Sequence, residues 1–182
     1  MASNLTTPKT IHEGVIRLCA KIGATQAPVF IPAAKPESGF LPLYCFENSQ
    51  AKVETSGGSV VLGWTLWEFP RVMIEGEFHA VWRSPDGVLV DVTPRPDGEE
   101  RILFVPDVSR RYEGLRVDNI RMALSPDPAI LELIAANEEM FRVRTRGSRA
   151  FTRIEPPDSE IEPIMRRIWD ASGRIKKRLK LR

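Results

Sequence analysis

The sequence has little cysteine and no long apolar run, and both absences narrow what the protein can be. Cys19 and Cys45 are the only cysteines among 182 residues, too few for a disulfide framework and without the paired spacing of a zinc finger. No stretch approaches the roughly 18 consecutive apolar residues of a membrane span, and the first residues lack the layout of a secretory signal. We therefore expect a cytoplasmic protein with free thiols and no membrane span.

The composition and the lack of internal repeats exclude disordered, fibrous and repeat proteins. Apolar residues make up 42% of the chain and charged residues 27%, which is incompatible with wholesale disorder or a fibrous rod. A repeat of about 20–50 residues, the mark of solenoids and propellers, is also absent. The length suits one ordinary domain that can bury a core without staples.

The charge is uneven along the chain. Residues 1–100 carry 8 basic and 12 acidic side chains, and residues 101–182 carry 18 basic and 12 acidic. The stretch 165–182 holds eight basic side chains and one acidic one. Such a basic tail suits a weak anionic partner such as nucleic acid, or a membrane surface, while a solvated amphipathic helix packed on the domain is the commoner arrangement. Nothing in the tail resembles a helix-turn-helix, an RNA-recognition signature or a zinc finger.

A first helix is predicted over residues 11–22. Thr10 can cap it, Glu13 completes a capping box and Gly23 stops it. Its apolar positions recur at helical spacing and include Cys19, which we interpret as a core residue.

Three further helices follow from start and stop signals. One begins near Cys45 and ends at the Ser-Gly-Gly of 56–58, which places this cysteine at a helix N-terminus. Asp127 can cap another with Pro128 at its first position, and the last covers about 159–180.

Strands are predicted where β-branched and aromatic residues alternate. They cover 29–31, 59–69, 72–83, 88–93 and 102–106. The fold class is therefore α+β, an antiparallel sheet with the N-terminal and the cysteine-bearing helix packed on it. We expect a catalytic unit over 1–124 and a helical region over 125–182 that packs on the same domain.

The turn Ser-Pro-Asp-Gly at 84–87 predicts which side chains share a face of the hairpin. Its residues favour a three-residue loop, which places His79 opposite Thr93 and Asp91 diagonal to His79, with their Cβ atoms under about 8 Å apart. One face then carries Glu75, Glu77, His79, Val81, Leu89, Asp91 and Thr93. The other carries Ile74, Phe78, Ala80, Trp82, Val88, Val90 and Val92, and is expected to be core. The first face is mainly polar but also carries Val81 and Leu89. We therefore expect it to be partly covered, as in a cleft.

Cys45 is the residue whose setting would supply a nucleophile to this pair. A helix N-terminus and a neighbouring imidazolium both lower the pKa of a thiol. His79 would then take and return the proton, Asp91 would orient the imidazole, and the backbone N–H of Cys45 would stabilise an oxyanion.

These residues resemble the core of transglutaminase-like cysteine enzymes of the papain-like class. The resemblance covers about residues 45–93 and lies in CFENS, GGSVVLGWTLWEF, EFHAVW and DGVLVDVTP. The longer string is also similar to uncharacterised bacterial proteins, some of which end in a SEC-C zinc motif that this sequence lacks. The resemblance implies a papain-like fold and a Cys-His-Asp triad but names no substrate, and such folds include members that only bind.

Each triad residue also has an ordinary role. Cys45 can be a buried thiol, His79 a hydrogen-bonded strand residue, and Asp91 a strand-end carboxylate that accepts backbone N–H groups. A zinc site of the same three is chemically available, but no HExxH or CxxC motif supports it and His12 is expected to be exposed. We expect no metal or cofactor.

Substrate contacts are assigned to Asn48, one helical turn after Cys45, and to Trp64, which with Trp67 can wall a groove. A polar first-turn residue and a core tryptophan are their ordinary roles. Glu75 and Glu77 can act as an acid–base or cation-binding pair, although an exposed strand face is the simpler interpretation.

The sequence thus predicts a cysteine hydrolase or acyltransferase acting on an amide, ester or thioester of a protein or small molecule. The alternative is a non-catalytic module that binds a protein or nucleic acid through the cleft or the basic tail.

Overall fold

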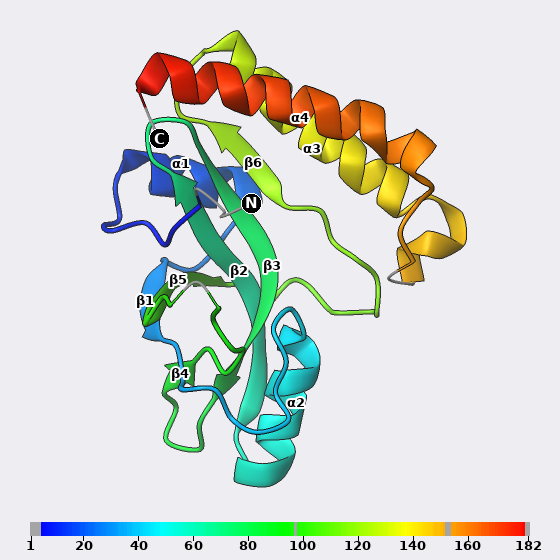
Figure 1. Ribbon diagram of the computed structural model, residues 1–182. Helices are drawn as coiled ribbons and strands as arrows, with labels where there is room; N and C mark the ends of the chain where they lie inside the picture. Colours follow the sequence, from blue (N-terminus) through cyan, green and yellow to red (C-terminus); the bar gives the residue numbers. More distant parts are fainter. Residues whose placement is uncertain (1–4, 97, 152–153, 181–182) are drawn as a thin grey trace.

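Helices and one antiparallel sheet make up the protein, in agreement with the predicted α+β class (Figure 1). A computed structural model describes residues 5–96, 98–151 and 154–180. In chain order the elements are α1 (Glu13–Ile22), β1 (Val29–Pro32), α2 (Cys45–Ser56), β2 (Ser59–Phe69), β3 (Met73–Arg83), β4 (Leu89–Val90), β5 (Arg101–Pro106), β6 (Ile120–Ala123), α3 (Pro128–Arg144), the 3-10 helix η1 (Gly147–Phe151) and α4 (Asp158–Leu179).

The turn between β3 and β4 has the predicted form. Ser84 N donates to Val88 O at 2.9 Å, and Gly87 N donates to Ser84 O at 2.9 Å, with Gly87 at φ 87°. The resulting pairing of Trp82 with Val90 is the predicted register. Val88 is 55% exposed at the tip of this hairpin, so its assignment to the core face was wrong.

β4 is shorter than the predicted strand over 88–93 because the chain changes partner at Asp91. Asp91 N donates to Pro32 O at 2.9 Å, and Ala34 N donates to Asp91 O at 2.7 Å. These bonds form a parallel bridge between Asp91 and Ala33. Asp91 is therefore held by the end of β1.

The sheet closes on itself through this bridge. Its strand order is β1-β5-β2-β3-β4, with β6 paired to β3, so the bridge joins the two outermost strands of the path. The enclosed side chains form a small apolar cluster of Ile31, Val61, Val81, Ile102 and Phe104. Asp91 lies at the seam of the closed sheet.

The main core lies between α1 and the opposite face of the sheet. Val15, Leu18 and Cys19 of α1 contact a buried set consisting of Trp64, Leu66, Ile74, Phe78, Leu103 and Val105. The prediction that Cys19 is a core residue is confirmed. Burial raises the pKa of the Cys19 thiol.

His12 caps α1, whereas the sequence predicted Thr10. The imidazole Nδ1 of His12 accepts from Gly14 N at 3.1 Å, and its Nε2 lies 3.3 Å from Glu68 Oε1 on β2. The ring thus caps the N-terminus of α1 and joins the helix to the sheet. The expected exposure of His12 was also wrong, because only 35% of its side chain is exposed.

The C-terminal helices pack against each other and against one end of the β2–β3 hairpin (Figure 1). Asp127 caps α3 as predicted, accepting from Ala129 N at 2.7 Å. β6 was missed, because residues after about 120 were expected to be helical. Its four residues pair with Met73–Gly76 of β3, a tertiary contact that local sequence does not reveal. The predicted boundary at residue 124 falls between β6 and α3.

None of the described helices is long and apolar enough to cross a membrane.

Gly63 of β2, which pairs with His79, is expected to tolerate no side chain. A Cβ there would lie 2.2 Å from Val105 O and 2.5 Å from Phe104 Cζ. Gly63→Ala should lower the free energy of unfolding by about 1–3 kcal/mol, the usual cost of overpacking, as measured by urea denaturation. Gly173→Ala in α4 is the control. Its Cβ meets no described atom within 4 Å, so it should raise stability by about 0.5–1 kcal/mol. Equal stability of Gly63→Ala and the wild type would contradict this packing.

Candidate functional site

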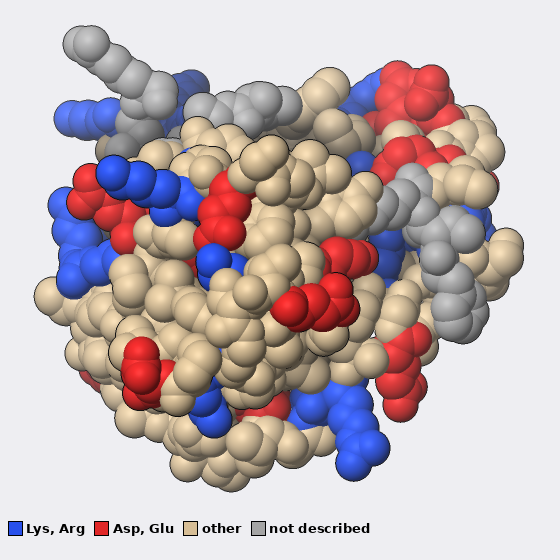
Figure 2. Space-filling model, turned by 90° about the horizontal axis from the view of Figure 1, so that it is seen from below, with Lys and Arg blue, Asp and Glu red and all other residues tan. Residues whose placement is uncertain are grey.

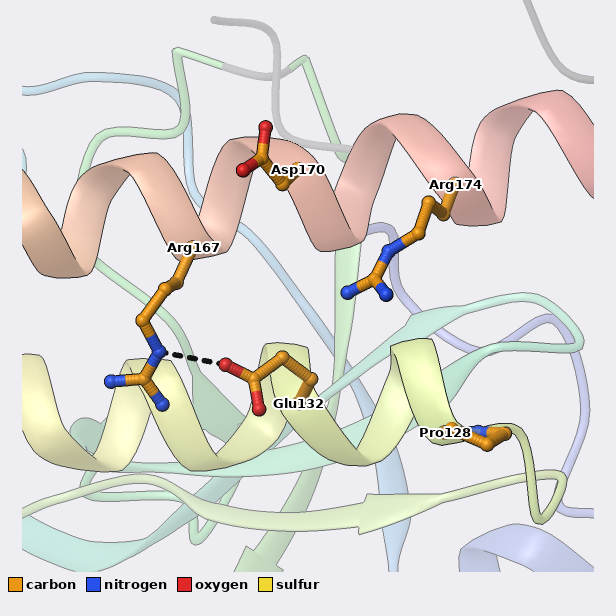
Figure 3. A pocket seen from close by; sticks show the side chains of 5 residues that line it. All are labelled: Pro128, Glu132, Arg167, Asp170 and Arg174. Carbon is orange, nitrogen blue, oxygen red and sulfur yellow. Dashed lines mark hydrogen bonds and ion pairs between the residues drawn. The ribbon is translucent and has the colours of Figure 1, made fainter.

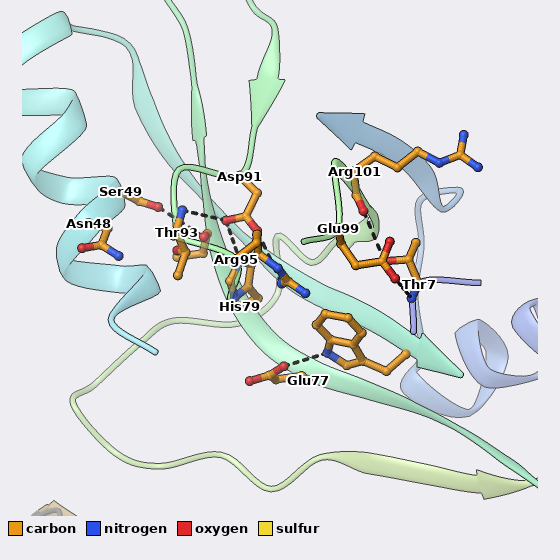
Figure 4. A network of polar contacts seen from close by, with 12 residues as sticks. Thr7, Asn48, Ser49, Glu77, His79, Asp91, Thr93, Arg95, Glu99 and Arg101 are labelled. Atoms are coloured by element: carbon orange, nitrogen blue, oxygen red, sulfur yellow. Dashed lines mark hydrogen bonds and ion pairs between the residues drawn. The ribbon is translucent and has the colours of Figure 1, made fainter. Parts of the chain in front are cut away.

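His79 and Asp91 form a buried pair at the seam of the sheet (Figure 4). His79 lies on β3 and is 6% exposed, while Asp91 follows β4 and is fully buried. His79 Nε2 lies 3.1 Å from Asp91 Oδ1. The turn therefore brings together the two residues that the hairpin register predicted to be neighbours.

Asp91 is held by contacts on both carboxylate oxygens. Thr93 N donates to its Oδ1 at 3.0 Å, and Arg95 Nη1 lies 3.7 Å from its Oδ2. Burial on its own raises the pKa of Asp91, but the His79 charge and hydrogen bond, the Thr93 N–H and Arg95 together lower it below its ordinary value. Asp91 is therefore ionised at neutral pH.

Cys45 is the first residue of α2, as predicted, and lies beside His79. Along its outer edge β3 pairs with β6 at one end and with β4 at the other, and α2 packs beside the stretch between them. Ser49 Oγ donates to Ala80 O of that stretch at 3.2 Å. This contact holds the start of α2 against the strand, and Cys45 and His79 line the same cavity.

The environment of His79 favours its charged form. Burial lowers the pKa of His79, but the negative charges of Asp91 and of a Cys45 thiolate, with hydrogen bonds to both, raise it well above its ordinary value. Since Nε2 is bonded to Asp91, Nδ1 is the ring nitrogen left for the thiol proton. The arrangement can therefore hold an imidazolium beside Cys45.

Two cavities are lined in part by Cys45. The smaller, of about 220 Å³, is lined by Leu43, Cys45, Trp67, Glu77, His79, Thr93, Arg95 and Pro96. The larger, of about 510 Å³, is bounded mainly by the segment 112–119 and by α2, and shares Leu43, Cys45 and Glu77 with the smaller. Cys45 itself is only 7% exposed, and what is exposed faces these cavities.

The two residues predicted to contact substrate serve the fold. Trp64 is fully buried, and its Nε1 donates to Asp107 Oδ2 at 3.0 Å, so it walls no groove. Asn48 is 4% exposed, accepts from Leu41 N at 3.2 Å and donates to Leu41 O at 2.8 Å. Its amide thus ties the preceding loop to α2. Trp67, named as the other tryptophan of the pattern, does line the smaller cavity.

Glu75 is buried, which corrects the expectation of an exposed acidic strand face. Arg121 Nε lies 3.1 Å from its Oε2, and Asn119 Nδ2 donates to its Oε1 at 3.1 Å. Burial raises the pKa of Glu75 even so, with Arg121 and Asn119 opposing the rise. Glu75 joins β3 to β6 and is not part of either cavity lining.

Arg95 was missed by the sequence analysis. It stacks over the Trp67 ring, 4.3 Å from the centroid, and reaches back to Asp91. Its position four residues after Asp91 is only a weak sequence signal that it belongs to the site. Only the path of the chain after β4 brings it to the site.

The basic tail packs as an amphipathic helix, and several of its arginines have acidic partners. Arg167 Nε lies 2.7 Å from Glu132 Oε1 (Figure 3), and Arg167 also pairs with Glu139. Arg178 pairs with Asp127. Residues 181–182 of the predicted tail lie outside the described residues. On the face shown in Figure 2, acidic and basic side chains are interspersed, with no area of one sign.

No three His, Cys, Asp or Glu side chains in the described part of the chain are grouped so as to hold a metal ion. His79 Nε2 and Asp91 Oδ1, which a zinc site would need, face each other. The zinc alternative thus gains no support from the geometry.

Comparison with known proteins gave no match to a protein-family model, a curated protein or a solved structure. Function has to be argued from the site itself.

Asp91→Asn is expected to destabilise the protein by about 3 kcal/mol near pH 5–6, because it leaves buried His79 without its counter-charge. The raised pKa of His79 contributes stability that is complete below about pH 6.5 and is lost as pH rises through the folded value. The lowered pKa of Asp91 contributes stability that is lost as pH falls below about 4. Urea denaturation from pH 3 to 10 should therefore show that the free energy of unfolding of Asp91→Asn falls furthest below that of the wild type between about pH 4 and 6.5.

Asp86→Asn, in the exposed hairpin loop, is the matched control and should change stability by less than about 0.5 kcal/mol. A deficit for Asp91→Asn that is independent of pH would show that the charge pair is not its cause.

Proposed function

We propose that this protein is a cysteine-dependent acyl-transfer enzyme, most simply a hydrolase of an amide, ester or thioester. One observation carries the proposal: His79 and Cys45, the first residue of α2, line the same cavity, and His79 Nε2 lies 3.1 Å from the buried carboxylate of Asp91. Nucleophile, base and orienting group thus stand in the order that covalent acyl transfer requires.

Acylation starts with transfer of the Cys45 proton to His79 Nδ1. The thiolate attacks the carbonyl carbon, and the C–O π electrons move to oxygen. N–H groups at the start of α2, which lack intrahelical acceptors, are suited to stabilise this oxyanion. The intermediate collapses as His79 returns the proton to the leaving nitrogen, oxygen or sulfur. A thioester on Cys45 remains.

Deacylation repeats the sequence with water as the nucleophile. His79 accepts a proton from water, the hydroxide oxygen attacks the thioester carbonyl, and the Cys45 thiolate leaves. A free acid is released. An amine or alcohol in place of water gives transfer instead of hydrolysis.

Asp91 acts through His79 in both steps. Its oxygen fixes the ring so that Nδ1 faces Cys45, and its charge stabilises the imidazolium that forms. The Thr93 N–H and Arg95 keep the carboxylate ionised.

A transglutaminase-like, papain-like fold belongs to the same proposal. It is supported by a cysteine that opens a helix, a histidine on a central strand of an antiparallel sheet, and an aspartate after the next strand. The motifs quoted from residues 45–93 support it independently.

The proposal predicts a covalent intermediate on Cys45. With p-nitrophenyl acetate the wild type should release p-nitrophenolate while the Cys45 peptide becomes acetylated, as followed by absorbance and peptide mass spectrometry. His79→Ala should slow acetylation by about 10²–10⁴, the usual contribution of a general base. Cys19→Ala is the matched control and should react like the wild type. Equal nitrophenolate release by the wild type and Cys45→Ala would refute the proposal.

A further inference from the structure

Glu77 is the carboxylate that both cavities beside Cys45 share. It lies on β3 two residues before His79, on the same face, and lines the smaller and the larger cavity alike. Its Oε2 accepts from Trp67 Nε1 at 2.7 Å, which fixes the direction of the carboxylate (Figure 4). The residue is partly buried, so water screens it less than an exposed carboxylate.

The buried carboxylates beside the site are already matched. Asp91 faces His79 and Arg95, and Glu75 faces Arg121. In the described part of the chain, Glu77 takes part in no ion pair. Its negative charge therefore remains available to a ligand.

Two arginines line the cavities, one in each. Arg95 lines the smaller cavity, stacked on Trp67 and turned toward Asp91. Arg116 lines the larger one, where Glu47 adds a second carboxylate. The acidic group common to both cavities is Glu77.

We propose that Glu77 selects substrates that carry a positively charged amine close to the scissile carbonyl. This inference rests on the proposed acyl-transfer function and narrows its substrate class to cationic acyl compounds such as lysine-containing peptides or acylated polyamines. The ammonium group lies against Glu77 while the carbonyl carbon faces the sulfur of Cys45. Coulomb attraction over a few ångströms in a partly buried site favours such a ligand over an anionic one.

Methanethiosulfonate reagents test this without knowledge of the substrate. In the reaction the Cys45 thiolate attacks the sulfenyl sulfur, a disulfide forms, and methanesulfinate leaves with the electron pair of the broken S–S bond. The methyl reagent is neutral, the trimethylammonioethyl reagent is cationic and the sulfonatoethyl reagent is anionic. The ratio of the cationic to the anionic rate, each divided by the rate of the same reagent with free 2-mercaptoethanol, measures the charge preference at Cys45 alone, in a Cys19→Ala background.

In the wild type this ratio is expected to exceed about tenfold, because one full charge acts with opposite sign on the two reagents. Glu77→Gln should reduce it at least fivefold, since the amide oxygen still accepts from Trp67 while the charge is gone. Glu77→Lys should invert it. Glu54→Gln, the matched control on the exposed surface of α2 and outside the lining of both cavities, should change it less than twofold.

A wild-type preference for the sulfonate reagent would overturn the inference and assign the cavities to anionic substrates held by Arg95 or Arg116. A ratio unaffected by Glu77→Gln would overturn it as well. Failure of the proposed function shows differently, as a neutral-reagent rate that is no faster than that of an ordinary thiol and does not change in His79→Ala.

Discussion

The backbone bridge between Asp91 and the end of β1 is the contact on which the site depends. β4 pairs with β3 over only two residues, so β3 alone would not fix the next residue. Because the N–H and C=O of Asp91 bond to Pro32 and Ala34, its side chain has one direction left, toward His79. The same bridge closes the sheet around the apolar cluster that includes Val81. The bridge therefore both closes the sheet and orients the carboxylate. Because it already orders the backbone of Asp91, the buried ion pair forms with little further loss of conformational entropy.

A series of groups with alternating charge includes Asp91. Arg95, Asp91, His79 and Cys45 stand in sequence, each next to a group of opposite charge when the sulfur is a thiolate. Asp91 stabilises the charged form of His79, and His79 and Arg95 stabilise the charged form of Asp91, which offsets the cost of burying this pair. Glu77 lies outside this series, with Trp67 as its hydrogen-bond donor. The division separates the groups that would activate the sulfur from the group that would choose the ligand.

Local sequence signals predicted the hairpin and the residue neighbours that its register sets. Pro85, Asp86 and Gly87 determine the loop, the loop determines the register, and the register brings Asp91 to His79. Cys45 at a helix start follows equally from local signals. The contact of Cys45 with His79 does not, because it requires α2 to pack beside the one stretch of β3 that β6 and β4 leave uncovered. Trp64 and Asn48 were misassigned for the same reason. A tryptophan on a strand and a polar residue in a first helical turn acquire their roles from tertiary partners, here Asp107 and Leu41.

The central claim is that His79 activates the thiol of Cys45, and the pH dependence of iodoacetamide alkylation tests it most directly. Labelling of Cys45 and Cys19 is followed by peptide mass spectrometry in the wild type and in His79→Ala. The account predicts rapid alkylation of Cys45 at pH 6, at least about tenfold slower in the variant, while Cys19, which lines neither cavity, stays unlabelled. Alkylation of Cys45 that rises only near the pKa of an ordinary thiol, about 8.5, and is identical in the two proteins would contradict it.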